Sequence, residues 1–164
     1  MKITEIKYEL VDLSGGAHAL AFQLLGNSDD AADAVHDAFA TVLGKPTGYD
    51  RDKGPLKPWF LRVVRNRCLD LLRQRRPNDE SVDTLIDENA TPEEATEIDQ
   101  RDQALKRALA GISSDQRQIL ILRDYLDLSY AEIAKVLGVA SGTVMSRLHR
   151  ARLSLREVLN SYDK

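Results

Sequence analysis

The 164-residue chain has one cysteine, few aromatic residues and no long hydrophobic run. A single cysteine cannot form an internal disulfide, and an aromatic content of 5% suits helix bundles better than β-sandwiches. No stretch of eighteen apolar residues is present, and residues 1–13 are too charged for a secretory signal. We therefore expect a cytoplasmic protein without membrane insertion. Its hydrophobic content of 43% is sufficient for one or two small cores.

Groups of residues that carry out catalysis are also missing. The sequence has no CxxC pair and no phosphate-binding P-loop, and its three histidines are scattered: His18, His36 and His149. Three carboxylates, Asp30, Asp33 and Asp37, share one face of a predicted helix, but no partner with metal-ligand spacing accompanies them. We expect no enzyme, no metal site and no cofactor, and interpret Cys68 as a core residue.

The net charge of −3 is unevenly distributed along the chain. Residues 1–76 carry a balance of +2, residues 77–99 one of −9, and residues 100–164 one of +4. The middle segment contains two prolines, no basic residue and few bulky apolar residues, as is typical of an unpacked chain. The sequence thus predicts an all-α protein with two small helical domains, 1–76 and 100–164, joined by a flexible acidic linker, 77–99.

The second predicted domain contains a helix-turn-helix. Ser129 and Glu132 have the spacing of a capping box, which places a helix start at Tyr130. Gly138 can adopt the left-handed conformation that ends a helix, and Ser141 can cap the next one only a few residues later.

The second helix of this motif has one apolar and one polar face. Its apolar stripe at helical spacing consists of Val144, Leu148, Ala151, Leu155 and Val158. Between residues 147 and 156 there are four arginines and no acid. Such a charge run alone is compatible with an ordinary solvated helix face, but a helix-turn-helix presents its second helix to the major groove. The predicted DNA contacts are Thr143, Ser146, Arg147, His149 and Arg150.

The sequence of the first domain predicts several helices separated by short breaks. We expect helices over residues 17–25, 28–43 and 58–75, with a Gly/Pro-rich loop over 44–57. Gly15 and Gly16 are poor helix formers and are expected to interrupt the chain before residue 17.

The last of these helices is strongly basic. Residues 58–76 contain one acidic residue, Asp70, and six arginines: Arg62, Arg65, Arg67, Arg73, Arg75 and Arg76. This imbalance predicts either a phosphate-facing surface or a costly repulsion. Trp59 at the helix start is interpreted either as a core residue or as a platform on which an unpaired base stacks.

Four segments of the second domain resemble the promoter-recognition domain of bacterial sigma factors of the extracytoplasmic-function (ECF) type. They are DQR at 115–117, LRD at 122–124, SYAEIAKVLGV at 129–139 and GTVMSRLHRAR at 142–152. In the first domain, ADAVHD at 32–37 resembles the family's polymerase-binding motif, and PWFLRVVRNRCLDLLRQRR at 58–76 resembles its minus-ten segment.

The resemblance implies a sigma factor that binds core RNA polymerase, directs promoter recognition and transcription initiation, and is controlled by an anti-sigma factor. Asp33, Val35 and Asp37 would bind the polymerase, and the loop over 44–57 would form a pocket for a flipped base. The minus-ten contacts would be Trp59, Arg62, Arg65, Asn66, Asp70 and Arg73. The helix-turn-helix would read the minus-thirty-five element as duplex DNA.

Two other interpretations stay open at this point. A free-standing dimeric repressor would use the same helix-turn-helix but should bind a palindrome alone, and we see no dimerisation helix after Leu159. An enzyme would need a nucleophile, a metal set or a phosphate loop. Binding of promoter DNA with or without core polymerase distinguishes them.

The length of the acidic linker limits how far apart the two domains can bind DNA. Its 23 residues reach roughly 75 Å when fully extended and span about 25 Å when relaxed. Two turns of duplex cover about 70 Å. If the two domains read elements that far apart, the polymerase would have to hold them open.

Overall fold

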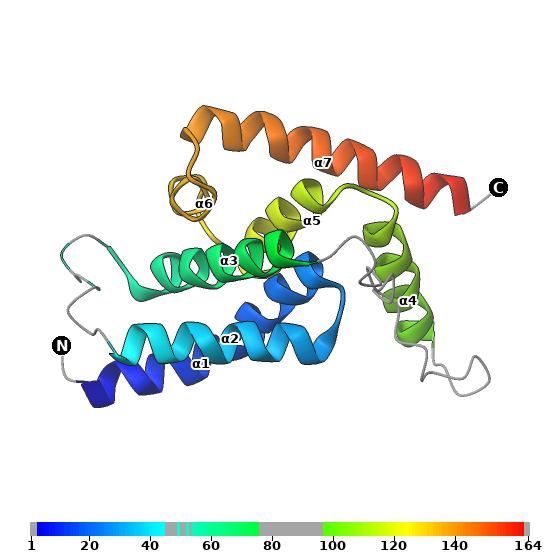
Figure 1. The fold of residues 1–164 in the computed structure, drawn as a ribbon. Helices are drawn as coiled ribbons and strands as arrows, with labels where there is room; N and C mark the ends of the chain where they lie inside the picture. The colour runs from blue at the N-terminus through cyan, green and yellow to red at the C-terminus, as the bar shows by residue number, and fades with distance from the viewer. Residues whose placement is uncertain (1–2, 45–48, 50–51, 53, 76–96, 163–164) are drawn as a thin grey trace.

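The computed structural model describes residues 3–44, 49, 52, 54–75 and 97–162 and is helical throughout its regular structure (Figure 1). This confirms the predicted all-α class. The elements are α1 (Ile3–Leu25), α2 (Ser28–Gly44), α3 (Leu56–Gln74), α4 (Glu97–Ala110), α5 (Ser114–Leu120), the short π-helix η3 (Ile121–Tyr125), α6 (Tyr130–Leu137) and α7 (Ser141–Tyr162).

Helices α1, α2 and α3 pack against one another as an N-terminal module. Gly26 ends α1 with a φ of 74°, and the side chain of Asn27 accepts a hydrogen bond from the Asp30 amide at 3.0 Å to begin α2. Phe39 of α2 and Phe60 of α3 stack with ring centroids 5.3 Å apart. Helix α3 begins two residues earlier than predicted.

The expectation that Gly15 and Gly16 interrupt the first helix is wrong. Helix α1 is continuous from Ile3 to Leu25. Glycine weakens a helix by about 1 kcal/mol relative to alanine, and the burial of α1 against its neighbours outweighs that preference. Gly16 has a different function in the fold: a Cβ built on it would lie 2.5 Å from Cδ2 of Leu126, so only glycine lets that side chain approach so closely.

The C-terminal module contains the predicted helix-turn-helix. Both members of the Ser129 and Glu132 capping box are bonded, and Gly138 is left-handed with a φ of 70°. On α7 the side chains of Val144, Leu148 and Ala151 are buried, while Leu155 and Val158 are half-buried. The apolar stripe is therefore confirmed.

The connection between α5 and α6 is irregular. After α5 the helix widens into η3, and the amide of Leu126 donates to the carbonyl of Ile121 at 2.8 Å. Asp127 then has a φ of 60°, an unusual conformation for a residue other than glycine. Leu126 is 8% exposed and lies against α1.

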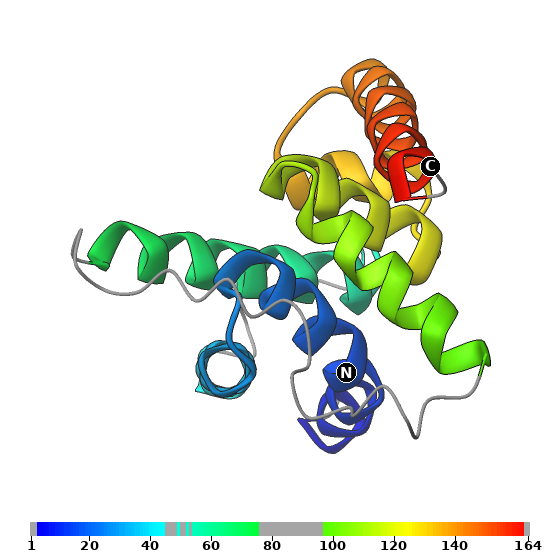
Figure 2. The same ribbon diagram turned by 90° about the vertical axis from the view of Figure 1, so that its right-hand side faces the viewer.

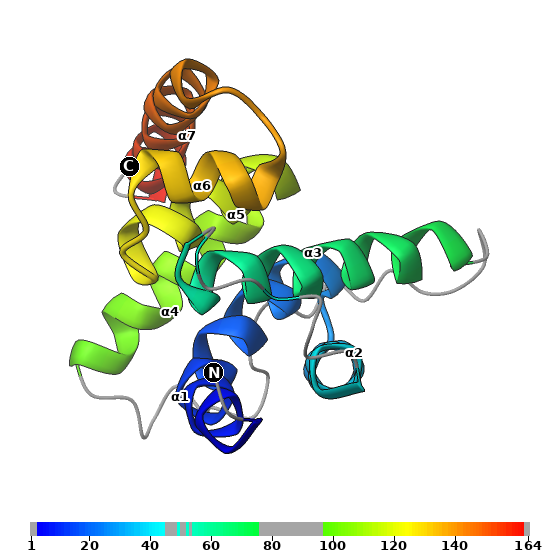
Figure 3. The same cartoon turned by 90° about the vertical axis from the view of Figure 1, so that its left-hand side faces the viewer.

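The two modules are packed together. Helix α3 contacts α6, and α1 contacts α5 and η3, so that the C-terminal module covers the N-terminal half of α3 while α1 and α2 lie on its other side (Figures 2 and 3). The buried residues of both modules form one hydrophobic cluster. Most of the predicted acidic linker lies outside the described residues, and α4 begins at Glu97, inside the predicted linker range.

Candidate functional site

Helix α7 presents a polar surface on the side opposite its buried stripe. Ser146, Arg147, His149 and Arg150 are exposed, and Thr143 is half-buried. The Ser146 hydroxyl donates to the carbonyl of Thr143 at 3.1 Å within the helix. The predicted minus-thirty-five residues therefore lie together on the first three turns of α7, where a helix-turn-helix contacts base edges.

Two side-chain contacts fix α7 on its module. Arg152 forms an ion pair with Asp124, with one nitrogen 2.6 Å from Oδ1 and Nε 3.4 Å from Oδ2. The bond to Asp124 raises the pKa of Arg152. On the other side, Gln116 donates to the hydroxyl of Ser154 at 3.0 Å. The orientation of α7 is thus set from η3 and α5.

On α3, two of the four arginines have an acidic partner. Arg67 pairs with Asp37 of α2 at 3.0 Å, and Arg73 pairs with Asp70 at 2.9 Å. Arg62 is exposed and forms no ion pair within the described residues. The sequence left two interpretations of the α3 arginines open, a phosphate-facing surface or a costly repulsion. In the structure, carboxylates bonded to some of these arginines reduce the repulsion.

Arg75, just after α3, also bonds within the N-terminal module. It donates to the carbonyl of Leu25 at 2.8 Å and lies 3.5 Å from the carboxylate of Asp30. It therefore connects the ends of α1 and α3 rather than facing solvent freely.

Arg65 has a partner in the other module. Its Nε donates to Oε1 of Gln118 on α5 at 2.7 Å, and Gln118 is 1% exposed. Burial lowers the pKa of Arg65; Asp115 opposes the shift, and Arg147 and Arg62 add to it. A predicted minus-ten residue is therefore half-buried between the modules.

The structure supports one of the two predicted interpretations of Trp59, that of a core residue, while base stacking stays a prediction. It is half-buried and packs against the core, and its ring lies 5.3 Å from that of Tyr49 at an angle of 44°. The Tyr49 hydroxyl donates to the carbonyl of Gly54 at 3.0 Å. The predicted flipped-base pocket involves residues 44–57, half of which lie outside the described residues.

The remaining predicted minus-ten residues lie on the solvent side of α3. Asn66, Asp70 and Arg73 are exposed, as is Arg62 one turn earlier. They share the helix with half-buried Arg65, so the structure brings the whole predicted set together on α3.

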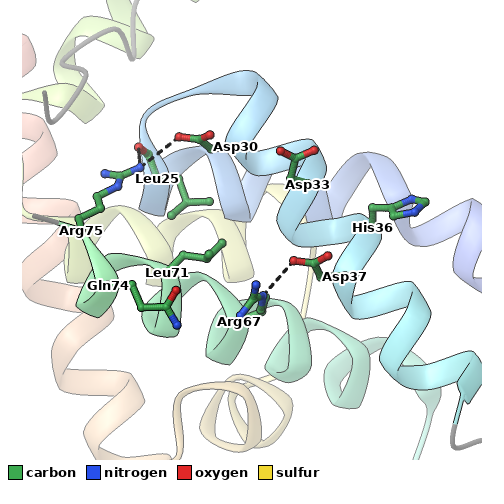
Figure 4. A pocket seen from close by; sticks show the side chains of 9 residues that line it. All are labelled: Leu25, Asp30, Asp33, His36, Asp37, Arg67, Leu71, Gln74 and Arg75. Atoms are coloured by element: carbon green, nitrogen blue, oxygen red, sulfur yellow. Dashed lines mark hydrogen bonds and ion pairs between the residues drawn. The ribbon is translucent and has the colours of Figure 1, made fainter. Parts of the chain in front are cut away.

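Helices α2 and α3 form the walls of a pocket of about 570 Å³ (Figure 4). Its lining residues are Leu25, Asp30, Asp33, His36, Asp37, Arg67, Leu71, Gln74 and Arg75. The three carboxylates predicted to share a face all reach this pocket, and Arg67 and Arg75 face two of them across it. Within the described residues the Asp33 carboxylate forms no ion pair, so it is available to a cationic partner.

Val35 does not belong to this surface. It is 5% exposed and lies in the core, so its side chain packs beneath the motif and cannot contact the polymerase directly. Asp33 is exposed and Asp37 is half-buried in its pair with Arg67.

Cys68 is fully buried on α3, as predicted. Burial raises the pKa of its thiol to about 12, and the charge of Arg67 opposes this shift. The thiol therefore stays protonated at neutral pH and behaves as an apolar group.

Sequence reasoning missed the residues that hold the surfaces in place. Gln118, Asp115 and Asp124 are neighbours of the basic side chains only after folding, and no local spacing links them to α3 or α7. The one available signal was Gln118 itself, a polar residue flanked by the apolar pair Ile119 and Leu120.

Two kinds of feature are absent from the described part of the chain. No group of three or more histidine, cysteine, aspartate or glutamate side chains there could hold a metal ion. None of its helices is long and apolar enough to span a bilayer.

The chain matches known families over most of its length. Residues 12–77 match Sigma-70 region 2, and residues 102–155 match Sigma-70, region 4. The ECF RNA polymerase sigma factor SigM of Mycobacterium tuberculosis is 35% identical over 146 residues, which cover 87% of this chain and 70% of SigM. SigE of Mycolicibacterium smegmatis is 33% identical, and there the alignment covers 89% of this chain and 58% of SigE.

Solved structures show the same architecture. The sigma factor RpoE from Bartonella quintana, in a complex with the anti-sigma factor NepR, aligns with a TM-score of 0.76 and 30% identity over 95% of this chain and 97% of RpoE. CnrH, in a complex with the cytosolic domain of CnrY, aligns with a TM-score of 0.69 and 22% identity, which supports the fold.

Proposed function

Because the chain belongs to the ECF type of RNA polymerase sigma factors, we propose that it binds core RNA polymerase and directs it to promoters. The observation that carries the proposal is the recognition face of α7. Its exposed Ser146, His149 and Arg150 stand opposite the buried stripe, on a helix fixed by Arg152 and Asp124. The family is one of transcription regulators, and the protein supplies base recognition while the polymerase supplies the chemistry.

The minus-thirty-five element is read by α7 as duplex DNA. Arginine recognises guanine through two hydrogen bonds in the major groove, and serine and threonine bond to either base type. Arg147 and Arg150 provide guanidinium groups, and Thr143, Ser146 and His149 lie between or beside them on α7.

The minus-ten strand is held by α3. Exposed Arg62 and Arg73 contact phosphates, and Asn66 and Asp70 on the same surface contact unpaired bases. Unstacking a base costs a few kcal/mol, which stacking on a side chain such as Trp59 and charge neutralisation must offset.

Core polymerase docks on α2. Asp33 and the neighbouring wall of the α2–α3 pocket form a surface with a carboxylate that makes no ion pair within the described residues, which suits a basic surface on the polymerase. The site of action is then the cytoplasm, where the polymerase works.

An anti-sigma factor controls access to these surfaces. The support is the 95% alignment to RpoE, a protein whose structure was solved with its anti-sigma factor bound. The arrangement of both modules in this chain is thus close to one that an anti-sigma factor binds.

Run-off transcription with purified core polymerase on a genomic library tests the proposal. We expect transcripts that begin at a set of promoters and depend on the added chain, and we expect Arg150→Ala to reduce them. The Glu157→Gln variant changes another exposed residue of α7 and serves as the control. Binding of a palindromic site by the chain alone, with no effect on core polymerase, would instead indicate a dimeric repressor.

A further inference from the structure

Met145 is an exposed apolar side chain on the part of α7 that is proposed to contact DNA. The large hydrophobic side chains that are exposed in the described residues are Tyr8, Val11, Leu105, Tyr125, Met145 and Leu153. Of these, Met145 alone lies on the first two turns of α7, a helix on the outer side of the C-terminal module (Figure 1). Its side chain is 59% exposed. Single exposed hydrophobic residues are common, so the position of Met145 decides its interpretation.

The rotation of α7 about its axis turns Met145 toward solvent. Val144 and Leu148 are 0% and 2% exposed and hold the helix against its module. Successive residues of an α-helix are rotated by about 100° from one another, so Met145 lies beside His149 on the exposed face. Arg147, one position before Leu148, lies toward the opposite edge of that face. The face therefore has an apolar edge at Met145 and a basic edge at Arg147.

The helix turn before Met145 leaves room beside its side chain. Helical side chains lean toward the N-terminus of their helix, so Met145 extends over the turn that contains Gly142. Gly142 is exposed, and apart from its chain neighbours the described residues place no side chain within 4 Å of where its Cβ would be. Base edges can therefore approach Met145 from the end of α7 that a helix-turn-helix inserts into the major groove.

The chemistry of Met145 matches one feature of the major groove. A thioether has no hydrogen-bond donor and is only a weak acceptor, so it cannot recognise the polar atoms of a base edge. The C5-methyl group of thymine is the apolar group that the major groove displays, and apolar side chains contact it. The neighbouring Ser146 is polar, and its hydroxyl donates to the carbonyl of Thr143 at 3.1 Å.

We propose that Met145 is a specificity-determining residue of α7, which selects thymine in duplex DNA by contact with the C5-methyl group. The selected T·A pair lies on the Met145 side of the site, and Arg147 faces the other side. This inference deepens the proposed function and rests on it in taking α7 as the helix that enters the major groove. The alternative is that the methyl group of half-buried Thr143 makes this contact.

Selection of duplexes from a random pool is the first test, with the full chain once bound to core polymerase and once alone. We expect the wild type to enrich thymine at one position. Met145→Gln should lose the preference at that position only, because glutamine has a similar length and helix propensity but a polar end. Leu153→Gln is the control, since Leu153 is 43% exposed about two turns further along α7. An unchanged preference in Met145→Gln, a loss at every position, or no enriched sequence in either form would overturn the proposal.

Deoxyuridine isolates the methyl group, because a dU·A pair keeps the hydrogen-bonding groups of a T·A pair. Deoxyuridine in place of the selected thymine should weaken binding by the wild type about fourfold, the factor for one methyl group in an apolar contact. Met145→Leu, which stays apolar, should keep most of this effect, and Met145→Gln should bind both duplexes equally. An effect of the same size in Met145→Gln would show that another group contacts the methyl and would overturn the proposal.

Thr143→Ser tests the alternative, because it removes the methyl group of Thr143 and keeps the hydroxyl. The ratio of the affinities for thymine and deoxyuridine should stay about fourfold in this variant. A ratio of one would assign the contact to Thr143 and overturn the proposal. Met145→Gln should also leave the salt slope unchanged, since it removes no phosphate contact. A lower slope would mean that Met145 positions α7 on the DNA backbone instead of selecting a base, and would overturn the proposal as well.

Run-off transcription separates this inference from the proposed function. If core polymerase gives no promoter-dependent transcript but the chain alone selects thymine through Met145, the proposed function fails and the inference stands. If transcripts begin at promoters and deoxyuridine has no effect on binding, the proposed function stands and the inference fails.

Discussion

Helices α3 and α7 carry the same number of arginines, four each, yet leave them in different surroundings. On α3, Arg65, Arg67 and Arg73 all bond to an acceptor side chain. On α7, Arg152 alone does so within the described residues. Helix α3 lies between α1, α2 and α6, whereas α7 is packed on one side only, against α4, α5 and α6. The charge of a helix therefore indicates what it could bind, and its neighbours decide how many of those charges remain free.

The largest expected effect is on α7, where three of the four arginines bond to no acceptor side chain within the described residues. Arg150→Ala should weaken binding of the polymerase-bound chain to its promoter by about 1–3 kcal/mol, because a side chain that contacts a base is lost. Arg67→Ala, which removes an arginine already bonded to Asp37, should change the affinity far less. Fluorescence anisotropy with promoter fragments measures both. Equal losses for the two variants would mean that the ion pairs of α3 do not restrict its arginines.

The buried faces of the two helices differ in their response to alkaline pH. Cys68 on α3 and Ala151 on α7 are both fully buried, but only the cysteine titrates. Its pKa is raised to about 12 in the folded chain, so the unfolded chain loses the proton first. The stability that the thiol contributes is complete below pH 9 and falls by about 1.4 kcal/mol per pH unit as the pH rises from 9 toward 12.

Urea unfolding of the wild type and of Cys68→Ala between pH 8 and 11 measures this difference. The difference in free energy of unfolding between the two proteins should be constant up to pH 9. Above pH 9 the free energy of unfolding of the wild type should fall relative to that of Cys68→Ala. A constant difference up to pH 11 would show that the thiol is accessible enough to ionise in the folded state.

A smaller effect separates two arginines within α3. Arg62 is exposed without an ion pair in the described residues, whereas Arg67 is bonded to Asp37. Arg62→Gln should lower the salt slope for a single-stranded oligonucleotide by about 0.7, the value for one phosphate contact on a single strand. Arg67→Gln should leave the slope unchanged and destabilise the fold by no more than about 1 kcal/mol, since the pair is partly exposed. The reverse pattern would assign the phosphate contact to Arg67.

The smallest expected effect is at Arg152 of α7, which forms an ion pair with Asp124. Asp124→Asn removes the charge that holds Arg152, and because both side chains are 48% exposed, the loss of stability should be about 0.2–1 kcal/mol. Chemical denaturation measures the loss, with Glu157→Gln on the same helix as the control. A loss well above this range would indicate that the pair positions α7 more firmly than an exposed ion pair can.

Local signals predicted much of the fold. The helix-turn-helix follows from the capping box at Ser129, from Gly138 and from the apolar stripe of α7, because each of these depends only on residues within a few turns. The same holds for the end of α1 at Gly26 and the burial of Cys68. The α7 residues proposed to contact DNA were identified because they lie opposite the apolar stripe of that helix. The structure confirms this stripe.

Other expectations depended on distant neighbours and were wrong or incomplete. Gly16 was expected to break α1 because its helix propensity is low, but tertiary packing overrides propensity, and Leu126 occupies the space that the missing side chain leaves. Val35 was assigned to the docking surface by its place in a motif, and it is buried beneath that surface.

The sequence alone determined the helical class, the helix-turn-helix and the apolar stripe of α7, since helix periodicity and capping are local and repeat along the chain. Only the tertiary structure decided which arginines of α3 are bonded and how the modules meet. Those outcomes come from pairs far apart in the sequence, such as Arg65 with Gln118 and Gly16 with Leu126. Their energies depend on distances of a few ångströms, which no pattern of residue types specifies.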